Sequence, residues 1–136
     1  MSRKAAREIA VKMAFEKLFG CDDTYATVSE ISGSEDEPLS EDVDFANGIV
    51  DGIVEHSKEI DELIGNASKG WHVERMPKVD LSVLRVAVYE LMYDKKAPKK
   101  VVINEAVRIA TKYGGDDSPR FVNGILGSIA GSDRNQ

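Results

Sequence analysis

The chain has 136 residues, of which 42% are hydrophobic and 31% charged, a balance typical of one globular domain and not of a disordered chain. Its single cysteine, Cys21, excludes an intrachain disulfide, and with only two histidines the sequence offers no zinc-type ligand set. No apolar run approaches the ~18 residues of a membrane span, and the first ten residues lack the apolar core of a secretory signal. We therefore expect a cytoplasmic protein without a zinc site or a membrane partner.

The net charge of −6 is unevenly distributed. Residues 1–17 carry +3 and residues 63–136 carry +4, whereas residues 18–62 carry −13. Because the Debye length is only about 8 Å at physiological salt, the basic ends can still bind an anion locally. The acidic composition therefore does not exclude a nucleic-acid partner, although it argues against nonspecific binding across the whole surface.

The first half of the chain predicts helices joined by one long polar connection. Apolar residues recur at helical spacing over residues 3–19. Residues 21–39 are polar and predict a connection, with room for a short helix near 24–31. Helical periodicity resumes over residues 40–56 and, after a kink, continues through Ile64.

The second half begins with the most apolar segment, residues 81–93. Its β-branched content is compatible with a strand, but its leucines and valines repeat at helical spacing and thirteen residues are long for a strand. We predict a helix buried on most sides, with Asp80 as its N-cap. Further helices are expected after Pro98 and from Ser118, which we interpret as an N-cap. Since no strand alternation competes, the predicted fold class is all-α.

No constellation of residues indicates an enzyme. The sequence lacks a glycine-rich phosphate loop and a nucleophile elbow. His56 and His72 stand alone, and Cys21 has no visible partner residue. The acidic run over residues 35–44 lacks the spacing of a calcium loop and is interpreted as a solvated segment. We predict a noncatalytic protein.

The first predicted helix carries a stripe of cations that ends in an aromatic ring. Arg3, Arg7, Val11 and Phe15 recur every four residues, and Lys4 lies beside them. Guanidinium groups bind phosphate oxygens and an aromatic ring can stack on an unpaired base, so the stripe suggests an RNA-binding face. The alternative is that the cations are a solvated helix start and the ring packs inside. If Arg7 is an exposed phosphate ligand, Arg7→Ala is expected to weaken RNA binding with little effect on folding.

The start of the last predicted helix is a second candidate. Asp117, Ser118, Arg120 and Phe121 place free backbone N–H groups, a cation and an aromatic ring together. The structural alternative is that the aspartate serves as a capping and dipole partner while the phenylalanine staples the helix to the core.

Four segments, in order along the chain, resemble the NusB transcription antitermination family. The most specific one reads Pro98-x-x-Val101-x-Ile103-Asn104-Glu105-Ala106-Val107 and then Gly114-x-x-Asp117-Ser118-x-x-Phe121-Val122-Asn123-Gly124-Ile125-Leu126. The others are Ala6-Arg7-x-x-Ala10-Val11, Phe45-x-x-Gly48-Ile49-Val50-x-Gly52-Ile53 and Leu84-Arg85-x-Ala87-x-Tyr89-Glu90-Leu91. The resemblance covers nearly the whole chain and fails chiefly over residues 20–40.

The resemblance implies a single domain of about seven helices in two small packed bundles, the first over about 1–70 and the second over about 71–136, without a cofactor. It implies binding of boxA, a short single-stranded element of nascent ribosomal-operon RNA, jointly with the ribosomal protein NusE, in an assembly that helps RNA polymerase pass terminators.

The family's functional positions map onto three groups of residues here. The RNA-binding residues implied by the resemblance are Arg3, Lys4, Arg7 and Phe15 in the first helix and Asp117, Ser118, Arg120 and Phe121 in the last. The residues implied at the NusE interface are Glu74, Arg75 and Asp80. Phe15 stands where members of the family often have tyrosine, which keeps a stacking ring but removes a hydroxyl.

Two other functions are compatible with the same pattern. One is a protein-interaction module, with a homodimer as one form, that binds RNA weakly or not at all. The other is the RNA-recognition domain of a ribosomal RNA cytosine methyltransferase, which resembles the same family but needs a methyl-donor domain for which 136 residues leave no room.

Overall fold

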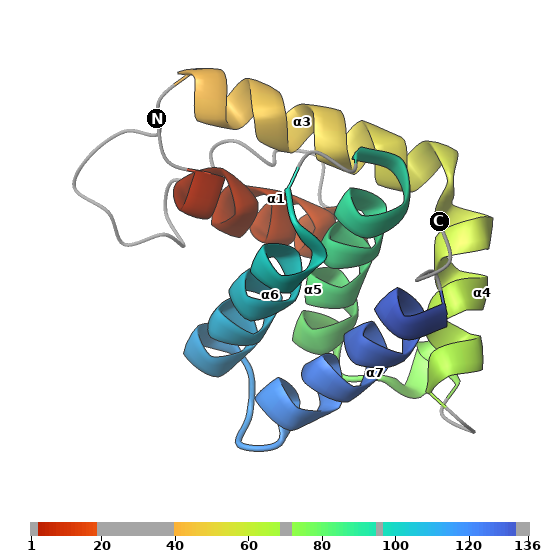
Figure 1. The fold of residues 1–136 in the computed structure, drawn as a ribbon. Helices are drawn as coiled ribbons and strands as arrows, with labels where there is room; N and C mark the ends of the chain where they lie inside the picture. The colour runs from red at the N-terminus through yellow and green to blue at the C-terminus, as the bar shows by residue number, and fades with distance from the viewer. Residues whose placement is uncertain (1–2, 19–39, 69–71, 95–96, 133–136) are drawn as a thin grey trace.

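The structure, a computed structural model, describes four stretches of the chain, residues 3–18, 40–68, 72–94 and 97–132. Within these stretches every regular element is helical and no strand occurs, so the all-α prediction is confirmed (Figure 1). They contain six α-helices where about seven helices were predicted. The short helix considered near 24–31 lies outside the described residues.

The predicted helices are found close to their expected limits. In chain order the α-helices are α1 (Arg3–Leu18), α3 (Ser40–Glu55), α4 (Ser57–Ala67), α5 (Lys78–Tyr89), α6 (Lys99–Tyr113) and α7 (Ser118–Ser132). A 3₁₀ turn, η1 (Val73–Arg75), precedes α5, and a π-helical turn, η2 (Glu90–Asp94), follows it directly. The kink predicted between the two middle helices is present, because His56 separates α3 from α4. None of the described helices combines the length and apolarity needed to cross a membrane.

Helix α5 is the centre of the fold. It packs against α1, α3, α4, α6 and α7, and Figure 1 shows it in the middle of the molecule, with α3 crossing above it. Eight of its twelve residues are buried. A helix with neighbours on most sides has no solvent face to carry polar residues, which explains the nearly continuous apolar run in its sequence.

Buried apolar side chains from all six α-helices form one continuous core. This core joins helices on both sides of residue 70, where the boundary between two bundles was predicted. Because one core is shared by all the described helices, it does not distinguish two bundles, and the division into two bundles stays a prediction.

The close approach of α3 to α5 depends on a glycine. A Cβ atom at Gly52 would overlap the ring of Tyr89, so any side chain at this position would force the tyrosine or the helix to move. The glycine at position 52 thus has a packing reason.

Two predicted N-caps are wrong. Helix α5 begins after Pro77, whose carbonyl accepts the first helical bond from Leu81 at 2.9 Å, so Asp80 lies inside the first turn. In α7 the N–H of Phe121 donates to the carbonyl of Asp117 at 3.0 Å, which makes Asp117 the residue before the first helical one. The hydroxyl of Ser118 instead accepts the N–H of Gly115 at 3.0 Å.

Candidate nucleic-acid interface

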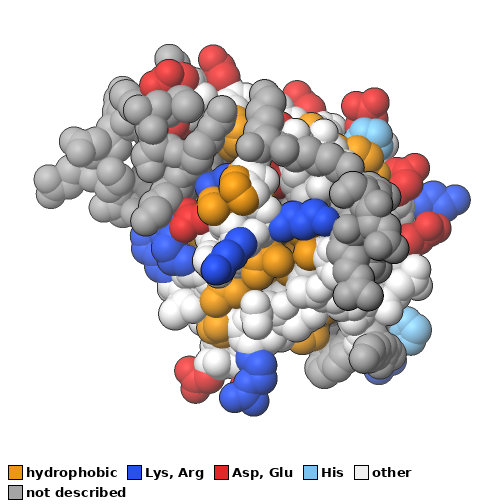
Figure 2. Space-filling view, in the orientation of Figure 1, with side chains coloured by type: hydrophobic (Ala, Val, Ile, Leu, Met, Phe, Trp, Pro, Cys, Tyr) orange, Lys and Arg blue, Asp and Glu red, His pale blue; other side chains and the backbone are white. Residues whose placement is uncertain are grey.

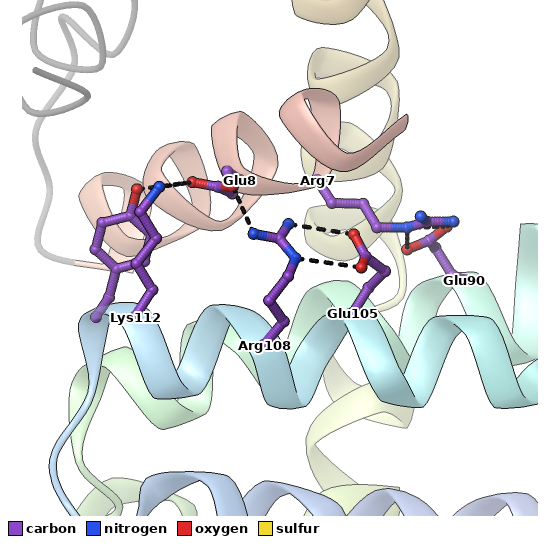
Figure 3. A network of polar contacts seen from close by, with 7 residues as sticks. Arg7, Glu8, Glu90, Glu105, Arg108 and Lys112 are labelled. Atoms are coloured by element: carbon purple, nitrogen blue, oxygen red, sulfur yellow. Dashed lines mark hydrogen bonds and ion pairs between the residues drawn. The ribbon is translucent and has the colours of Figure 1, made fainter. Parts of the chain in front are cut away.

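Arg7, predicted as an exposed phosphate ligand, is buried. Only 5% of the residue is exposed, and its Nε and Nη2 donate to the two carboxylate oxygens of Glu90 at 2.8 and 3.0 Å (Figure 3). Glu90 is itself 3% exposed. The prediction of an exposed Arg7 is wrong because α1 packs on α5 and turns this part of the stripe inward. Arg7 is an internal ion-pair partner, and the expectation of a small folding effect fails with it.

The rest of the predicted stripe divides into two parts. The side chains of Arg3 and Lys4 lie outside the described part of the chain, so their role stays a prediction. Val11 is buried in the core, in keeping with the inward orientation of Arg7.

Phe15 lines an open pocket of about 150 Å³ between α1, α5 and α6. The other lining residues are Val11 and Lys12 from α1, Val79 from α5, and Tyr113 from the end of α6. Phe15 and Tyr113 are both half-buried, so part of each side chain remains accessible to solvent. The pocket therefore combines aromatic and aliphatic walls with an opening to the surface, which suits a flat apolar group.

Two lysines, of which Lys12 lines the pocket, lie over the Tyr113 ring. The Nζ atom of Lys12 lies 4.9 Å from the centre of the Tyr113 ring, and that of Lys112 lies 5.2 Å from it. Both distances are within the ~6 Å range of a cation–π contact. Lys12 is largely buried whereas Lys112 is exposed. The aromatic pocket thus carries positive charge at its edge.

One carboxylate joins these groups across the helix interface. Glu8 Oε1 accepts the Tyr113 hydroxyl at 2.7 Å and Lys112 Nζ at 3.0 Å, and its Oε2 accepts Arg108 Nη1 at 2.9 Å (Figure 3). Arg108 also donates to both oxygens of Glu105, at 3.2 Å each. This network ties α1 to α6 beside the pocket.

The contacts of Glu8 determine its protonation. Burial alone would raise the pKa of the Glu8 carboxyl, but the hydrogen bonds from Tyr113, Arg108 and Lys112 outweigh burial and lower the pKa to about 2. Glu8 is therefore anionic throughout the neutral range, and its negative charge is shared among three donors.

This depressed pKa predicts a contribution to acid unfolding. The folded Glu8 pKa of about 2 lies below the value of 4.5 for an unperturbed glutamate, so the stabilisation is complete above about pH 4.5 and is lost as the pH falls to about 2. Glu8→Gln is expected to lower the free energy of unfolding at pH 7 and to reduce its decrease between pH 5 and pH 2.5. Urea denaturation at both pH values measures the difference. The control variant Glu55→Gln, at an exposed site, is expected to match the parent at both pH values. If Glu8→Gln loses as much stability between pH 5 and pH 2.5 as the parent does, the low pKa of Glu8 is contradicted.

The start of α7 presents part of the second predicted patch. Asp117 and Arg120 are exposed, as predicted. Phe121 is half-buried and packs against the core, in agreement with the stapling alternative. Ser118 is 5% exposed and its hydroxyl is engaged inside the protein, so it does not lie on the predicted binding surface.

The two patches adjoin one another. Only three residues lie between Tyr113, in the pocket, and Asp117, directly before α7, so their Cα atoms are at most about 14 Å apart. The sequence alone did not indicate that Lys12, Lys112 and Tyr113 belong with Phe15. Aromatic and cationic residues at adjacent positions at the end of a helix, before two glycines, are the only signal that the sequence offered.

Asp80, predicted at a partner interface, is also buried. It is 2% exposed, and its carboxylate hydrogen-bonds Ser118. Burial raises the pKa of the Asp80 carboxyl, and the bond from Ser118 opposes that rise. The placement of Asp80 on a partner-facing surface is therefore wrong, because the carboxylate joins the first turns of α5 and α7. Glu74 and Arg75 are exposed on η1, as an interface requires.

Charged side chains are unevenly distributed on the face shown in Figure 2. Lys and Arg side chains border an apolar strip near the centre of this face, whereas several Asp and Glu side chains lie along its upper and right edges, over α3 and α4. Among the described residues no group of three or more His, Cys, Asp or Glu side chains could hold a metal ion.

Comparison with known proteins shows which family this chain is similar to. A NusB family model matches residues 4–131 of the chain. The transcription antitermination protein NusB of Geobacter sulfurreducens is 43% identical over 130 residues, which cover 95% of this chain and 94% of that protein. A second NusB, from Clostridium novyi, is 37% identical and covers 95% of this chain and 98% of that protein.

Solved structures show the same fold. NusB of T. maritima matches with a TM-score of 0.80 and 36% identity, over 96% of this chain and 92% of that one. A chain in the crystal structure of the antitermination factors NusB and NusE in complex with double-stranded RNA matches with a TM-score of 0.79 and 27% identity, over 96% of each chain.

Proposed function

The chain belongs to the NusB family, and we propose that it binds single-stranded boxA RNA of nascent ribosomal-operon transcripts jointly with NusE. In this role it acts in the cytoplasm as a noncatalytic component, without a cofactor, of an assembly that helps RNA polymerase pass terminators. The family relationship supports transcription antitermination, and the structure of NusB and NusE with RNA supports the two classes of partner.

The pocket beside Phe15 is the observation that carries the RNA-binding proposal. Unpaired bases bind proteins by stacking on aromatic rings, while nearby cations contact the phosphates on either side. Phe15 and Tyr113 provide aromatic surface in an open apolar pocket, and Lys12 and Lys112 provide charge at its edge. Arg120, exposed in the first turn of α7, offers one more cation to the RNA.

The proposed RNA-binding surface therefore differs from the set that the sequence implied. Phe15, Asp117, Arg120 and the exposed part of Phe121 remain, Arg3 and Lys4 stay as predictions, and Arg7 and Ser118 leave the set because they are buried. We add Lys112 and Tyr113, together with Lys12, which is also buried but lines the pocket. For the NusE interface, Glu74 and Arg75 remain.

A titration of boxA RNA with the protein alone, and with the protein premixed with NusE, tests the proposal. We expect specific binding that NusE strengthens and that weakens with salt. If about three phosphates are neutralised, log K against log salt should have a slope near −2, at about 0.7 per phosphate for a single strand. A scrambled RNA of equal length is the control. Absence of binding under both conditions would favour the protein-interaction alternative, and sedimentation would then show whether the chain forms a homodimer.

Asp117 is predicted to oppose RNA binding. It is exposed directly before α7, where a carboxylate stabilises the helix by roughly 0.3–1 kcal/mol but repels an approaching phosphate. Asp117→Asn is expected to strengthen boxA binding several-fold with stability unchanged or slightly lower, whereas Arg120→Ala should weaken binding. Asp51→Asn, on α3, makes the same charge change at an exposed site elsewhere and controls for net charge. Equal gains for both aspartate variants would contradict a local role for Asp117.

A further inference from the structure

Three hydrogen-bond donors of α6 converge on a single carboxylate of α1. Glu8 accepts bonds from Arg108, Lys112 and Tyr113 at 2.7–3.0 Å, over both of its oxygens. A guanidinium, an ammonium and a hydroxyl are also the groups that proteins use to bind phosphate oxygens. The donor set around Glu8 therefore has the chemistry of an anion site that is already occupied by an internal anion.

This anion site is accessible and lies at the pocket. The Lys112 side chain is 55% exposed and that of Arg108 is 32% exposed, so both can reach a ligand in solvent. The Glu8 side chain is 17% exposed and lies beneath them. Lys112 is also one of the two lysines over the Tyr113 ring, which lines the pocket. A strand whose base enters the pocket would bring an adjacent phosphate to this site.

The local charge balance depends on Glu8. Two cations, Arg108 and Lys112, are paired with two carboxylates, Glu8 and Glu105, so these four side chains together carry no net charge. Removing the charge of Glu8 raises the net charge of these four side chains to +1 and leaves Lys112 without its anionic partner.

We propose that Arg108 and Lys112 form a phosphate-binding site for RNA at the edge of the Phe15 pocket, and that Glu8 is a resident counter-anion that limits its affinity. This proposal rests on the RNA-binding function proposed above. In the bound state an RNA phosphate takes over the outward donors of Lys112 and Arg108, while Glu8 keeps the hydroxyl of Tyr113. The ion pairs of Glu8 thus lower the affinity for RNA while they hold α1 against α6.

Glu8→Gln tests the proposal, because glutamine keeps the size and a hydrogen-bond acceptor but removes the charge. We expect boxA RNA to bind roughly threefold to tenfold more tightly, with a salt slope steeper by about 0.7, as for one additional phosphate contact. Glu55→Gln, at an exposed position of α3, makes the same change in net charge and is expected to leave the affinity within twofold. In the double variant Glu8→Gln/Lys112→Gln the gain should disappear.

A second variant covers the case in which Glu8→Gln does not fold, which circular dichroism would reveal. Lys112→Gln alone should weaken RNA binding about threefold, whereas Lys58→Gln, an exposed lysine at the start of α4, should not. This inference is overturned if the parent binds boxA but Glu8→Gln has the same affinity as Glu55→Gln. It is also overturned if Lys112→Gln has the same affinity as Lys58→Gln. Either result would leave the proposed function intact. Parent protein that binds no RNA, alone or with NusE, would instead refute the proposed function itself.

Discussion

Arg7→Ala is expected to lower the free energy of unfolding by about 3–5 kcal/mol, the typical cost of removing one partner of a buried ion pair. The guanidinium of Arg7 makes two-pronged contact with Glu90, and each residue is at most 5% exposed. Without Arg7, the buried Glu90 carboxylate loses its guanidinium hydrogen bonds. Urea denaturation at pH 7 measures the loss.

The same variant also separates the two interpretations of the first helix. Where Arg7→Ala remains folded, its boxA affinity should equal that of the parent, because Arg7 does not reach the surface. Arg7→Lys keeps the charge but loses the two-pronged hydrogen bonding of the guanidinium, so its stability should fall between those of the parent and Arg7→Ala. The double variant Arg7→Met/Glu90→Leu should recover much of the loss, because an apolar pair of similar volume often replaces a buried ion pair at little cost. Parent-like stability with lost RNA binding would restore the sequence-based interpretation.

The fold was predictable from the sequence where the signals are local. Helical periodicity and the nearby glycines and prolines predicted both ends of α6 and the start of α7 within a residue or two, because these signals act over a few residues. The N-cap predictions for Asp80 and Ser118 failed because their contacts are not local. Both residues are typical caps, but each is buried, and each hydrogen-bonds a group in another part of the fold.

The orientation of α1 was not predictable in the same way. Residues 9–14 are all buried, so the helix has neighbours on most sides and its sequence has no single apolar stripe to identify the solvent face. The partner that draws Arg7 inward, Glu90, is 83 residues away in the sequence. A charged residue at the start of a helix looks the same in sequence whether it binds a phosphate or a buried carboxylate.

The candidate site shows the same limit. Phe15 was identified from its place in a stripe, and it does line a pocket. Lys112 and Tyr113, which complete the site, come from α6, about a hundred residues away, and only the packing of α1 against α6 brings them together. Sequence patterns therefore located the aromatic ring, whereas the charge beside it emerged from the tertiary structure.

Phe15→Leu is expected to weaken boxA binding by about 1–3 kcal/mol, the usual contribution of one base stacked on an aromatic ring. Leucine keeps an apolar side chain in the pocket between α1, α5 and α6, but it offers no flat face to a base. The fold should tolerate the change, because Phe15 is half-buried at the edge of an open pocket. Equilibrium titration of each variant with boxA RNA at one fixed salt concentration, alongside its melting temperature, gives both quantities.

Two matched variants make the result specific to the pocket. Phe45→Leu, on α3, is the same substitution at a half-buried phenylalanine that does not line the pocket, and it should leave RNA affinity unchanged. Tyr113→Phe keeps the second ring but removes the hydroxyl that donates to Glu8, so stacking should survive while the stability falls slightly. Because stacking is an uncharged contact, the salt slope for Phe15→Leu should equal that of the parent even as the affinity falls. Equal affinities for Phe15→Leu and the parent would mean that the base binds elsewhere, and a flatter slope would mean that the substitution had moved the phosphate contacts instead.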